Sequence, residues 1–237
     1  MEVTTTAEVL LVDDERSFRD GLKALLSAEG YSVRVARDGE EAVRKFAECR
    51  PDLVILDVMM PKMNGFLACE KIRRSDRRVP VVFLTAKDAE VDQLRALGLG
   101  ADDYVSKSAP ESILIARIRR AVERSRDLSA APRPVAEADI VRLGRVAVNL
   151  STLDVSVSGR PTCSLTKTEA DVLRILAASR GRRMTTDELI AELRGAGFAC
   201  EDTMLYVHVS NLRRKLGPAA EMLSSSRGAG YCLRQME

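Results

Sequence analysis

Three carboxylates, one hydroxyl and one ammonium stand at the ends of short apolar runs in the first half of the sequence. In chain order these groups belong to Asp13, Asp14, Asp57, Thr85 and Lys107. Neighbouring carboxylates repel one another unless a hard cation joins them, and Mg²⁺ prefers oxygen ligands. An ammonium and a hydroxyl beside them suit a phosphoryl group that is carried on one carboxylate as an aspartyl phosphate.

The surrounding sequence predicts a fold that brings these groups together. Apolar runs rich in Val, Ile and Leu alternate with helical patterns, and strands are expected at residues 9–12, 31–35, 53–56, 81–84 and 104–105. Five alternations of strand and helix predict an α/β domain with a parallel sheet that is covered on both faces. Ligands of such folds lie beyond the carboxyl ends of the strands. Asp57 is therefore expected to end a rigid, buried strand so that it can be phosphorylated at the edge of the sheet.

A simpler interpretation of each group exists. A single Asp after a strand is more often a helix cap than a reactive carboxylate. A single Lys in such a position is usually solvated, and a single Thr usually packs or caps a helix. Five such groups at one edge are much harder to explain in this way.

Length and composition favour two domains in one soluble chain. The 237 residues are 46% hydrophobic, which is enough for two ordinary cores. The five cysteines show no Cys-x-x-Cys spacing, so they are interpreted as small apolar fillers in a reducing cytoplasm. The N-terminus lacks a basic segment before a long apolar one, so no signal peptide or membrane span is expected and the protein is placed in the cytoplasm.

The stretch "SRDLSAAPRPVAEAD" separates the two halves. Its prolines and small residues are typical of a short extended tether. The expected division is a first domain at 1–128, a linker at 129–138 and a second domain at 139–237. Lys and Arg number 22 against 23 Asp and Glu before residue 129, and 15 against 12 after it. The second half is thus slightly basic, which permits a nucleic-acid partner without proving one.

The second half predicts a small antiparallel sheet followed by three helices and a hairpin. The first helix begins with a capping box formed by Thr166 and Glu169, and Thr185 or Thr186 caps the second. In the third, the apolar positions are Leu205, Val209, Leu212 and Leu216. At about 100° per residue, the opposite face consists of Thr203, Val207, Ser210, Asn211 and Arg214. A solvated surface is the simpler interpretation of that face. The hairpin at 224–234 carries Arg227 at its tip, and this arrangement of helices and hairpin is typical of a winged helix that binds DNA.

Four motifs of the first half, "LLVDDE", "PDLVILDVMMPKMNG", "FLTA" and "GADDYVSK", closely resemble the receiver domain of two-component response regulators, which has a flavodoxin-like fold. The resemblance implies a sensor histidine kinase that donates phosphate to Asp57. It implies Mg²⁺ held by Asp14, Asp57 and the Met59 carbonyl, with Asp13 contributing through water. It also implies phosphoryl contacts from Thr85 and Lys107 and a switch role for Tyr104. The rival, a haloacid-dehalogenase-like phosphatase, would need Asp-x-Asp after the first strand, and "VDDE" lacks it.

Motifs of the second half, "LTKTEADVL", "VHVSNLRRKLG" and "RGAGYCL", are similar to the winged helix-turn-helix DNA-binding domain of the OmpR/PhoB class. The resemblance covers about residues 140–235. The base-reading candidates are Thr203, Val207, Ser210, Asn211 and Arg214. The expected phosphate contacts are Arg182, Arg183, Arg213, Lys215 and Arg227, and His208 is an expected backbone contact.

Three departures from the family pattern stand out. Ser108 occupies the place of the usual cis proline after the Lys, and a cis bond to a non-proline residue costs about 3 kcal/mol, so this loop is either strained or rearranged. Family dimers bury charge pairs between protomers; Asp103 and Arg117 fit one pair, whereas Gln93 with Ile113 and Gly98 with Arg119 do not fit the other two. The second helix ends in "ELRGAGF" without the frequent tryptophan, so RNA polymerase is a less secure partner.

The sequence as a whole indicates a phosphorylation-dependent transcription regulator. Phosphorylation is expected to promote a homodimer that binds tandem DNA half-sites, with no catalytic activity beyond slow self-phosphorylation and self-dephosphorylation. One alternative is a receiver-gated protein-interaction module. Another is a regulator that acts independently of phosphate.

Overall fold

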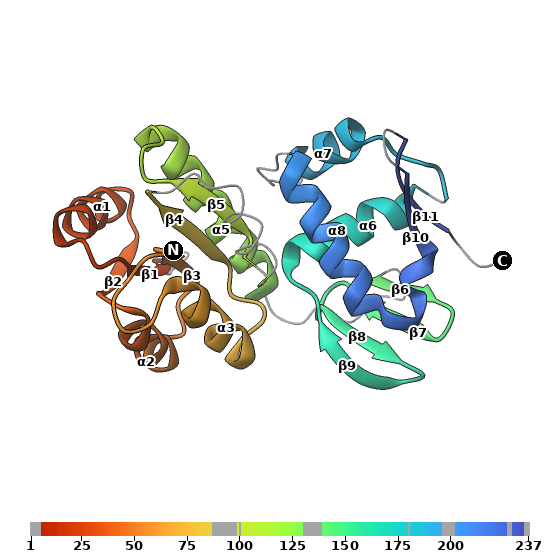
Figure 1. The fold of residues 1–237 in the computed structure, drawn as a ribbon, viewed down its shortest axis with the longest axis horizontal. Helices are drawn as coiled ribbons and strands as arrows, with labels where there is room; N and C mark the ends of the chain where they lie inside the picture. The colour runs from red at the N-terminus through yellow and green to blue at the C-terminus, as the bar shows by residue number, and fades with distance from the viewer. Residues whose placement is uncertain are drawn as a thin grey trace, which may run out of the picture. The chain divides into compact units, whose positions relative to one another are not determined.

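The computed structural model describes residues 6–86, 99, 101–129, 139–179, 181–195, 202–226 and 229–234. The chain divides into two compact units, Met1–Arg126 and Asp127–Glu237 (Figure 1). Most of the expected linker, residues 130–138, lies outside the described residues, so its exact limits stay a prediction. No helix in the described part of the chain is long and apolar enough to cross a bilayer.

The first unit is a parallel sheet with helices packed around it. Its elements are β1 (Glu8–Val12), α1 (Arg16–Ala28), β2 (Ser32–Ala36), α2 (Gly39–Cys49), β3 (Leu53–Leu56), α3 (Gly65–Ser75), β4 (Val81–Thr85), β5 (Asp103–Ser106) and α5 (Glu111–Ser129). The strand order is β2-β1-β3-β4-β5, and every pairing is parallel. The predicted five-stranded, doubly wound sheet is confirmed. Because β1 lies between β2 and β3, the order of the strands reverses beside it, where such folds bind ligands.

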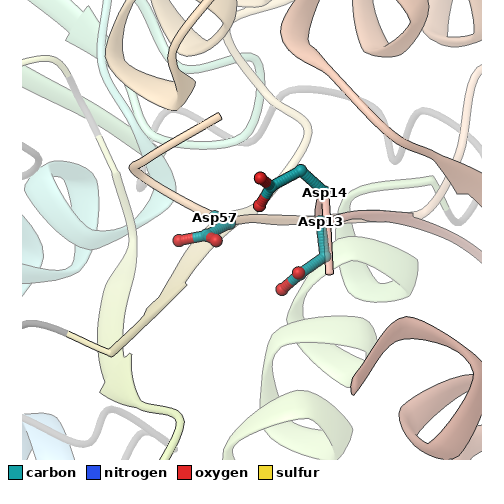
Figure 2. Close-up of side chains that lie close together, drawn as sticks. All are labelled: Asp13, Asp14 and Asp57. Atoms are coloured by element: carbon teal, nitrogen blue, oxygen red, sulfur yellow. The ribbon is translucent and has the colours of Figure 1, made fainter. Parts of the chain in front are cut away.

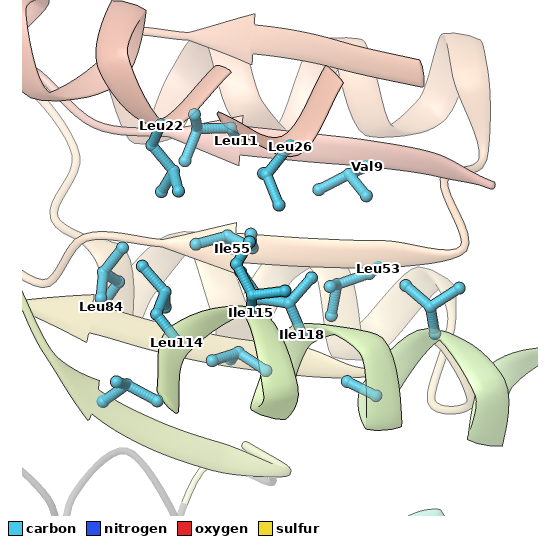
Figure 3. Close-up of a cluster of buried hydrophobic side chains, with 14 of the residues drawn as sticks. Val9, Leu11, Leu22, Leu26, Leu53, Ile55, Leu84, Leu114, Ile115 and Ile118 are labelled. Atoms are coloured by element: carbon cyan, nitrogen blue, oxygen red, sulfur yellow. The ribbon is translucent and has the colours of Figure 1, made fainter. Parts of the chain in front are cut away.

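Apolar side chains cover both faces of the sheet. On one face Val9 and Leu11 of β1 and Leu53 and Ile55 of β3 pack against α1 and α5 (Figure 3). The alternate residues of the same strands point to the other face and are equally buried, which explains why these strands appear in the sequence as continuous apolar runs. The strands are therefore held from both sides, and the residues at their ends have little freedom to move.

Side-chain caps fix the helices that follow β2 and β3. Asp38 accepts a hydrogen bond from the Glu41 backbone N–H at 2.9 Å, and Asn64 accepts one from the Leu67 N–H at 3.0 Å. The Lys62 ammonium lies 2.6 Å from Asp38. That contact, together with the helix N–H groups, holds the pKa of Asp38 below its usual range. Both loops beyond the strands are thereby anchored to helix starts.

The second unit combines an antiparallel sheet with three helices and a hairpin. Its elements are β6 (Ile140–Leu143), β7 (Val146–Asn149), β8 (Asp154–Val157), β9 (Arg160–Ser164), α6 (Lys167–Ala178), α7 (Thr186–Gly195), α8 (Asp202–Leu216), a 3₁₀ helix (Gly217–Met222), β10 (Leu223–Ser226) and β11 (Gly230–Leu233). Strands β6 to β9 pair in sequence, and β10 pairs with β11. The predicted sheet, helices and hairpin are confirmed. Thr166 and Glu169 form the expected capping box of α6.

The hairpin is tied to the segment that joins α6 and α7. Met184 and Tyr231 exchange two backbone hydrogen bonds of 2.8 Å. Gly230 has a φ of +87°, and a Cβ there would lie 1.9 Å from the Met184 carbonyl oxygen. Glycine is needed at this position because both its backbone conformation and the close approach exclude a side chain.

Candidate functional site

The three carboxylates predicted from the sequence meet at one edge of the first unit. Figure 2 shows the side chains of Asp13 and Asp14, which follow β1, close to that of Asp57, which follows β3. One oxygen from each carboxylate lies within 4.8 Å of the others. Asp13 and Asp57 are buried, whereas Asp14 is exposed, so the cluster faces solvent through Asp14.

Lys107 joins two of these carboxylates. Its Nζ lies 2.6 Å from Asp13 Oδ2 and 2.8 Å from Asp57 Oδ2, and it stands 4.8 Å from the centre of the Phe18 ring. Burial alone would lower the pKa of Lys107, but the two carboxylates outweigh burial and raise it. The ammonium therefore stays charged and balances one negative charge of the cluster.

Asp13 is the carboxylate with the highest electrostatic cost. Its side chain is 1% exposed, and burial raises its pKa more than the Lys107 contact lowers it. Oδ1 accepts a 2.9 Å hydrogen bond from the Glu15 backbone N–H, whereas Oδ2 accepts no well-aligned hydrogen bond from the described residues, although Lys107 is near. A buried carboxylate is strongly disfavoured unless cations compensate its charge, and Asp13 shares the single Lys107 ammonium with Asp57.

These features fit a bound divalent cation. Three carboxylates and one ammonium leave an excess of negative charge. All the side-chain donors are oxygens, the ligand type preferred by hard cations such as Mg²⁺ and Ca²⁺. The acidic cluster is therefore a divalent-metal site.

The backbone beneath Asp57 is fixed by the start of α3. The Gly65 N–H donates to the Val58 carbonyl at 2.9 Å. A Cβ on Gly65 would lie 2.0 Å from the Asp57 carbonyl oxygen and 3.1 Å from the Phe83 ring. Only a glycine lets the helix approach β3 this closely, which makes Gly65 a supporting residue of the site that sequence reasoning missed. The signal was the "NG" pair seven residues after Asp57.

The other predicted receiver residues fall at the same end of the sheet or beside it. Thr85 ends β4, but its side chain lies outside the described residues. Tyr104 is buried in β5. Met59 follows Asp57 and its N–H makes a long 3.4 Å contact with Asp57 Oδ1. No cis peptide occurs among the described residues, and Ser108 Oγ shares a 2.7 Å hydrogen bond with Ser106 Oγ, so the loop after Lys107 is rearranged relative to a cis-proline loop.

Helix α8 presents a narrower surface than the sequence predicts. Ser210 and Arg214 are exposed as expected. The expectation of a surface position is wrong for Val207, which is 8% exposed, and for Asn211, which is 6% exposed. His208 is also buried. Both α6 and α7 pack against α8, which leaves less of the helix free than a single neighbour would.

The exposed stripe of α8 includes a residue that the sequence analysis missed. Tyr206 is 64% exposed and lies four residues before Ser210 and eight before Arg214. The i, i+4, i+8 spacing of these three residues was the signal that could have identified them. Thr203 lies on α8, but its side chain is outside the described residues.

Two of the predicted phosphate contacts, Arg213 and Lys215, connect α8 to other elements of the second unit. Arg213 Nε donates to the Leu223 carbonyl at 2.8 Å, which ties α8 to the hairpin. Lys215 Nζ lies 2.6 Å from Oε2 of the buried Glu169 at the start of α6. Lys215 is thus better placed to hold two helices together than to contact a ligand.

The remaining arginines lie near the hairpin or outside the described residues. Arg182 pairs with Glu188 at 3.0 Å. Arg183 Nη1 lies 3.4 Å from both Ser226 Oγ and the Gly230 carbonyl, and its residue is exposed. Arg227 falls outside the described residues. The segment before α7 therefore carries two exposed cations beside the hairpin.

The residues predicted at a dimer interface include an ion pair that forms within the chain. Arg117 Nη1 of α5 lies 2.7 Å from Asp103 Oδ1 of β5, and both side chains are mostly buried. Ile113, on the same helix, is 46% exposed. Arg119 pairs with Glu29 at 2.8 Å. Gln93 and Gly98 lie outside the described residues.

Comparison with known proteins agrees with this geometry in both units. Residues 9–119 match the family model described as the response regulator receiver domain, and residues 159–233 match the model described as transcriptional regulatory protein, C terminal. The acidic cluster and the helices with their hairpin thus define a receiver joined to a winged-helix DNA-binding domain.

Relatives that match nearly the whole chain define the class of protein more closely. The chain is 35% identical over 232 residues to response regulator MprA of Mycobacterium bovis, which covers 97% of this chain and 98% of the relative. It is 36% identical over 230 residues to transcriptional regulatory protein TrcR of Mycobacterium tuberculosis, with coverages of 97% and 87%. A solved structure of a RitR mutant has a TM-score of 0.74 at 22% identity, covering 97% of this chain and 100% of that chain, which shows a likeness of fold.

The chain belongs to the two-component response regulators of the OmpR/PhoB class. It is a DNA-binding transcription regulator, and its family is one of transcription factors rather than of catalytic enzymes. The resemblance inferred from its sequence motifs is confirmed.

Replacement of Gly65 by Ala should destabilise the first unit by about 1–3 kcal/mol, because the new methyl group overpacks against the Asp57 carbonyl. Gly21→Ala is the matched control. Gly21 is exposed in α1, and no neighbouring group lies within 4 Å of the position that the new methyl group would take, so this change should stabilise the helix by about 0.5–1 kcal/mol. Urea denaturation of the two variants measures both effects, and equal effects of the same sign would contradict the close-approach argument.

Proposed function

We propose that Asp57 is the phosphoacceptor of this response regulator. The observation that carries the proposal is the position of Lys107 between Asp13 and Asp57 at the carboxyl ends of the strands. Of the three carboxylates, Asp13 is the most buried and accepts the Glu15 N–H. Among the described residues, Asp57 Oδ1 accepts only the long contact from the Met59 N–H, which leaves this oxygen available as a nucleophile.

Each residue of the site would have a separate role in phosphoryl transfer. An Asp57 oxygen attacks the phosphorus of the donor, the bond to the leaving group breaks, and the phosphoryl group remains on Asp57. Lys107 and the hydroxyl of Thr85 hold the phosphoryl oxygens. Asp13, Asp14, Asp57 and the Met59 carbonyl would hold Mg²⁺, which would supply positive charge opposite the phosphoryl oxygens. The proposed donor is a sensor histidine kinase. Because the regulator must reach both this kinase and DNA, we place it in the cytoplasm.

Phosphorylation is proposed to alter the equilibrium between two states of the receiver. The added charge can shift that equilibrium only through contacts that differ between the states. Lys107 now spans two carboxylates, and a phosphoryl group on Asp57 would compete with Asp13 for its ammonium. Movement of Thr85 and Tyr104 toward the phosphoryl group would carry the change to β4 and β5.

We propose that α8 enters the major groove of promoter DNA through Tyr206, Ser210 and Arg214. These residues form the exposed stripe of the helix, and a guanidinium can contact either a guanine edge or a phosphate. Arg182, Arg183 and Arg227 would hold phosphates beside the hairpin. The other residues assigned from the sequence remain secondary candidates. Val207, His208 and Asn211 are buried, Arg213 and Lys215 bind groups of other elements, and the side chain of Thr203 lies outside the described residues.

Activation is proposed to form a homodimer on tandem half-sites through the face that carries Ile113. Binding of two linked domains to adjacent half-sites gains affinity without new contacts. Asp103 and Arg117 already satisfy each other within one chain, and an exposed pair across an interface would add little. Ile113 supplies apolar area there, so the interface should depend weakly on salt.

The acceptor assignment is tested with purified full-length protein, Mg²⁺ and a small acyl phosphate. Intact mass should rise by one phosphoryl group, and Asp57→Asn should abolish the increase. Asp52→Asn is the matched control, because Asp52 stands before β3 and accepts the Glu8 N–H at 2.8 Å. It should label normally. Labelling that persists in Asp57→Asn would refute the assignment.

The DNA interface is tested by Arg214→Gln. Loss of one phosphate or base contact should weaken DNA binding by about tenfold or more. If the lost contact is to a phosphate, the slope of log affinity against log salt concentration should also decrease in magnitude by about 1. Arg142→Gln on β6 removes the same charge and should change neither quantity. Fluorescence anisotropy over a salt series measures both. If Ser210→Ala and Tyr206→Ala leave sequence preference unchanged, the proposed facing of α8 is wrong.

The dimer face is tested by sedimentation of the full chain with a phosphoryl mimic. Ile113→Glu should weaken dimerisation by about tenfold or more, because it removes buried apolar area. Leu67→Glu, at an equally exposed apolar position on α3, should have no effect. Affinity should change little as ionic strength rises. A tight dimer that salt dissolves, or one indifferent to Ile113→Glu, would contradict the proposal.

A further inference from the structure

A second polar site lies around the carboxyl end of the edge strand β2. It is an open pocket of about 290 Å³ lined by Arg19 of α1, by Val35, Ala36 and Arg37 at the end of β2, and by Glu41 and Lys45 of α2. Its residues come from three consecutive elements of the first unit, and Figure 1 shows α1 and α2 beside β2. None of them belongs to the phosphoryl site.

The lining carries three cations and one carboxylate. Lys45 Nζ lies 2.9 Å from Glu41 Oε1 and 2.5 Å from the Val35 carbonyl. Arg37 lies 3.6 Å from Glu41 Oε2 and also donates its backbone N–H to that oxygen at 3.0 Å. Although burial alone would raise the pKa of Glu41, the Lys45 and Arg37 contacts hold it below its usual value. Glu41 therefore stays ionised, and the pocket has a formal charge of +2.

Arg19 is the cation that Glu41 does not neutralise. Its Nη1 donates to the Asp13 carbonyl at 2.7 Å and lies 3.4 Å from the Asp14 carbonyl, and it contacts no carboxylate in the described part of the chain. A guanidinium has five N–H donors in a planar fork that matches phosphate. The backbone carbonyls fix its orientation, and several donors remain for a ligand in the cavity.

Size and charge together select the class of ligand. Pockets for small molecules usually have about 300–1,000 Å³, so this open pocket is at the lower limit and has room for a single phosphate group. Two positive charges are balanced better by a doubly charged phosphate group than by a single carboxylate. Val35 and Ala36 add a short apolar wall that can contact a small substituent.

We propose that the pocket formed by Arg19, Arg37, Glu41 and Lys45 binds a small phosphate-bearing molecule, such as a phosphate monoester. The three cations surround the phosphate group, and the short substituent lies against Val35 and Ala36. Arg19 would connect the ligand to the backbone carbonyls of Asp13 and Asp14, which its guanidinium contacts. The site is separate from Asp57, so this inference does not depend on the acceptor assignment.

The test uses the full-length protein, labelled for NMR and titrated with inorganic phosphate at constant ionic strength. EDTA is present so that no metal can bridge phosphate to the acidic cluster. The amide resonances of Ala36 and Arg37 should shift saturably. Glycerol phosphate should give the same shifts and displace inorganic phosphate.

Variants that each remove one positive charge from α2 or from the loop before it distinguish specific binding in the pocket from nonspecific electrostatic attraction of phosphate. Lys45→Gln and Arg37→Gln should each weaken phosphate binding by about tenfold, the expected loss for one hydrogen bond to a charged group. Arg44→Gln removes the same charge from the neighbouring position of α2, outside the pocket, and should change affinity by less than about twofold because charges near solvent are screened. Arg37 is exposed, so its variant keeps the test valid even if Lys45→Gln unfolds.

Three results would overturn the inference. They are a non-saturable shift, an equal loss of affinity in Arg44→Gln, and failure of glycerol phosphate to displace inorganic phosphate. The same titration in Asp57→Asn should be unchanged. A loss of phosphate binding in that variant would assign the signal to the acidic cluster and also overturn the proposal.

Discussion

The contact of one ammonium with two buried carboxylates is the constraint on which the first unit depends. Asp13 and Asp57 end adjacent strands, so their charges are forced together, and burial makes their repulsion costly. Lys107 reaches them from the end of β5, across the position of β4 in the sheet. One positive charge cannot balance three carboxylates. The site is therefore built with a deficit of positive charge, which a divalent cation can fill.

Such a site requires a rigid base, and the apolar strands supply it. Residues of β1 and β3 are buried on both faces of the sheet, so neither strand can shift to relieve the repulsion at its end. Gly65 brings the start of α3 onto the Asp57 backbone, and Asn64 caps that helix. Hydrophobic burial of the strands thus holds the carboxylates close together although they repel one another. A bound cation would relieve that repulsion, and the relief would contribute favourably to the free energy of cation binding.

The sequence predicted most of the fold because strand ends and helix starts leave local signals. Apolar runs, the Thr166 capping box and the order of elements identified the sheet and the winged-helix unit correctly. The surface of α8 was less predictable, because periodicity locates the core face but does not reveal how many neighbours flank the helix. Val207 and Asn211 were assigned to the surface on that basis, and Tyr206 was missed. Sequence analysis also did not identify Arg19, because its proposed role depends on a contact with the Asp13 backbone carbonyl, which side-chain patterns do not reveal.

The backbone of Asp13 separates two regions of opposite charge. Its carboxylate belongs to the acidic cluster, whereas its carbonyl accepts the Arg19 guanidinium at the wall of the basic pocket. An anion bound in the pocket would make the potential at the acidic cluster more negative, and a cation bound at the cluster would make the potential at the pocket more positive, so each would favour binding of the other. Linkage requires that such an effect be reciprocal. The short segment after β1 is thus the physical path by which an anion near β2 could alter the charge balance around Asp57.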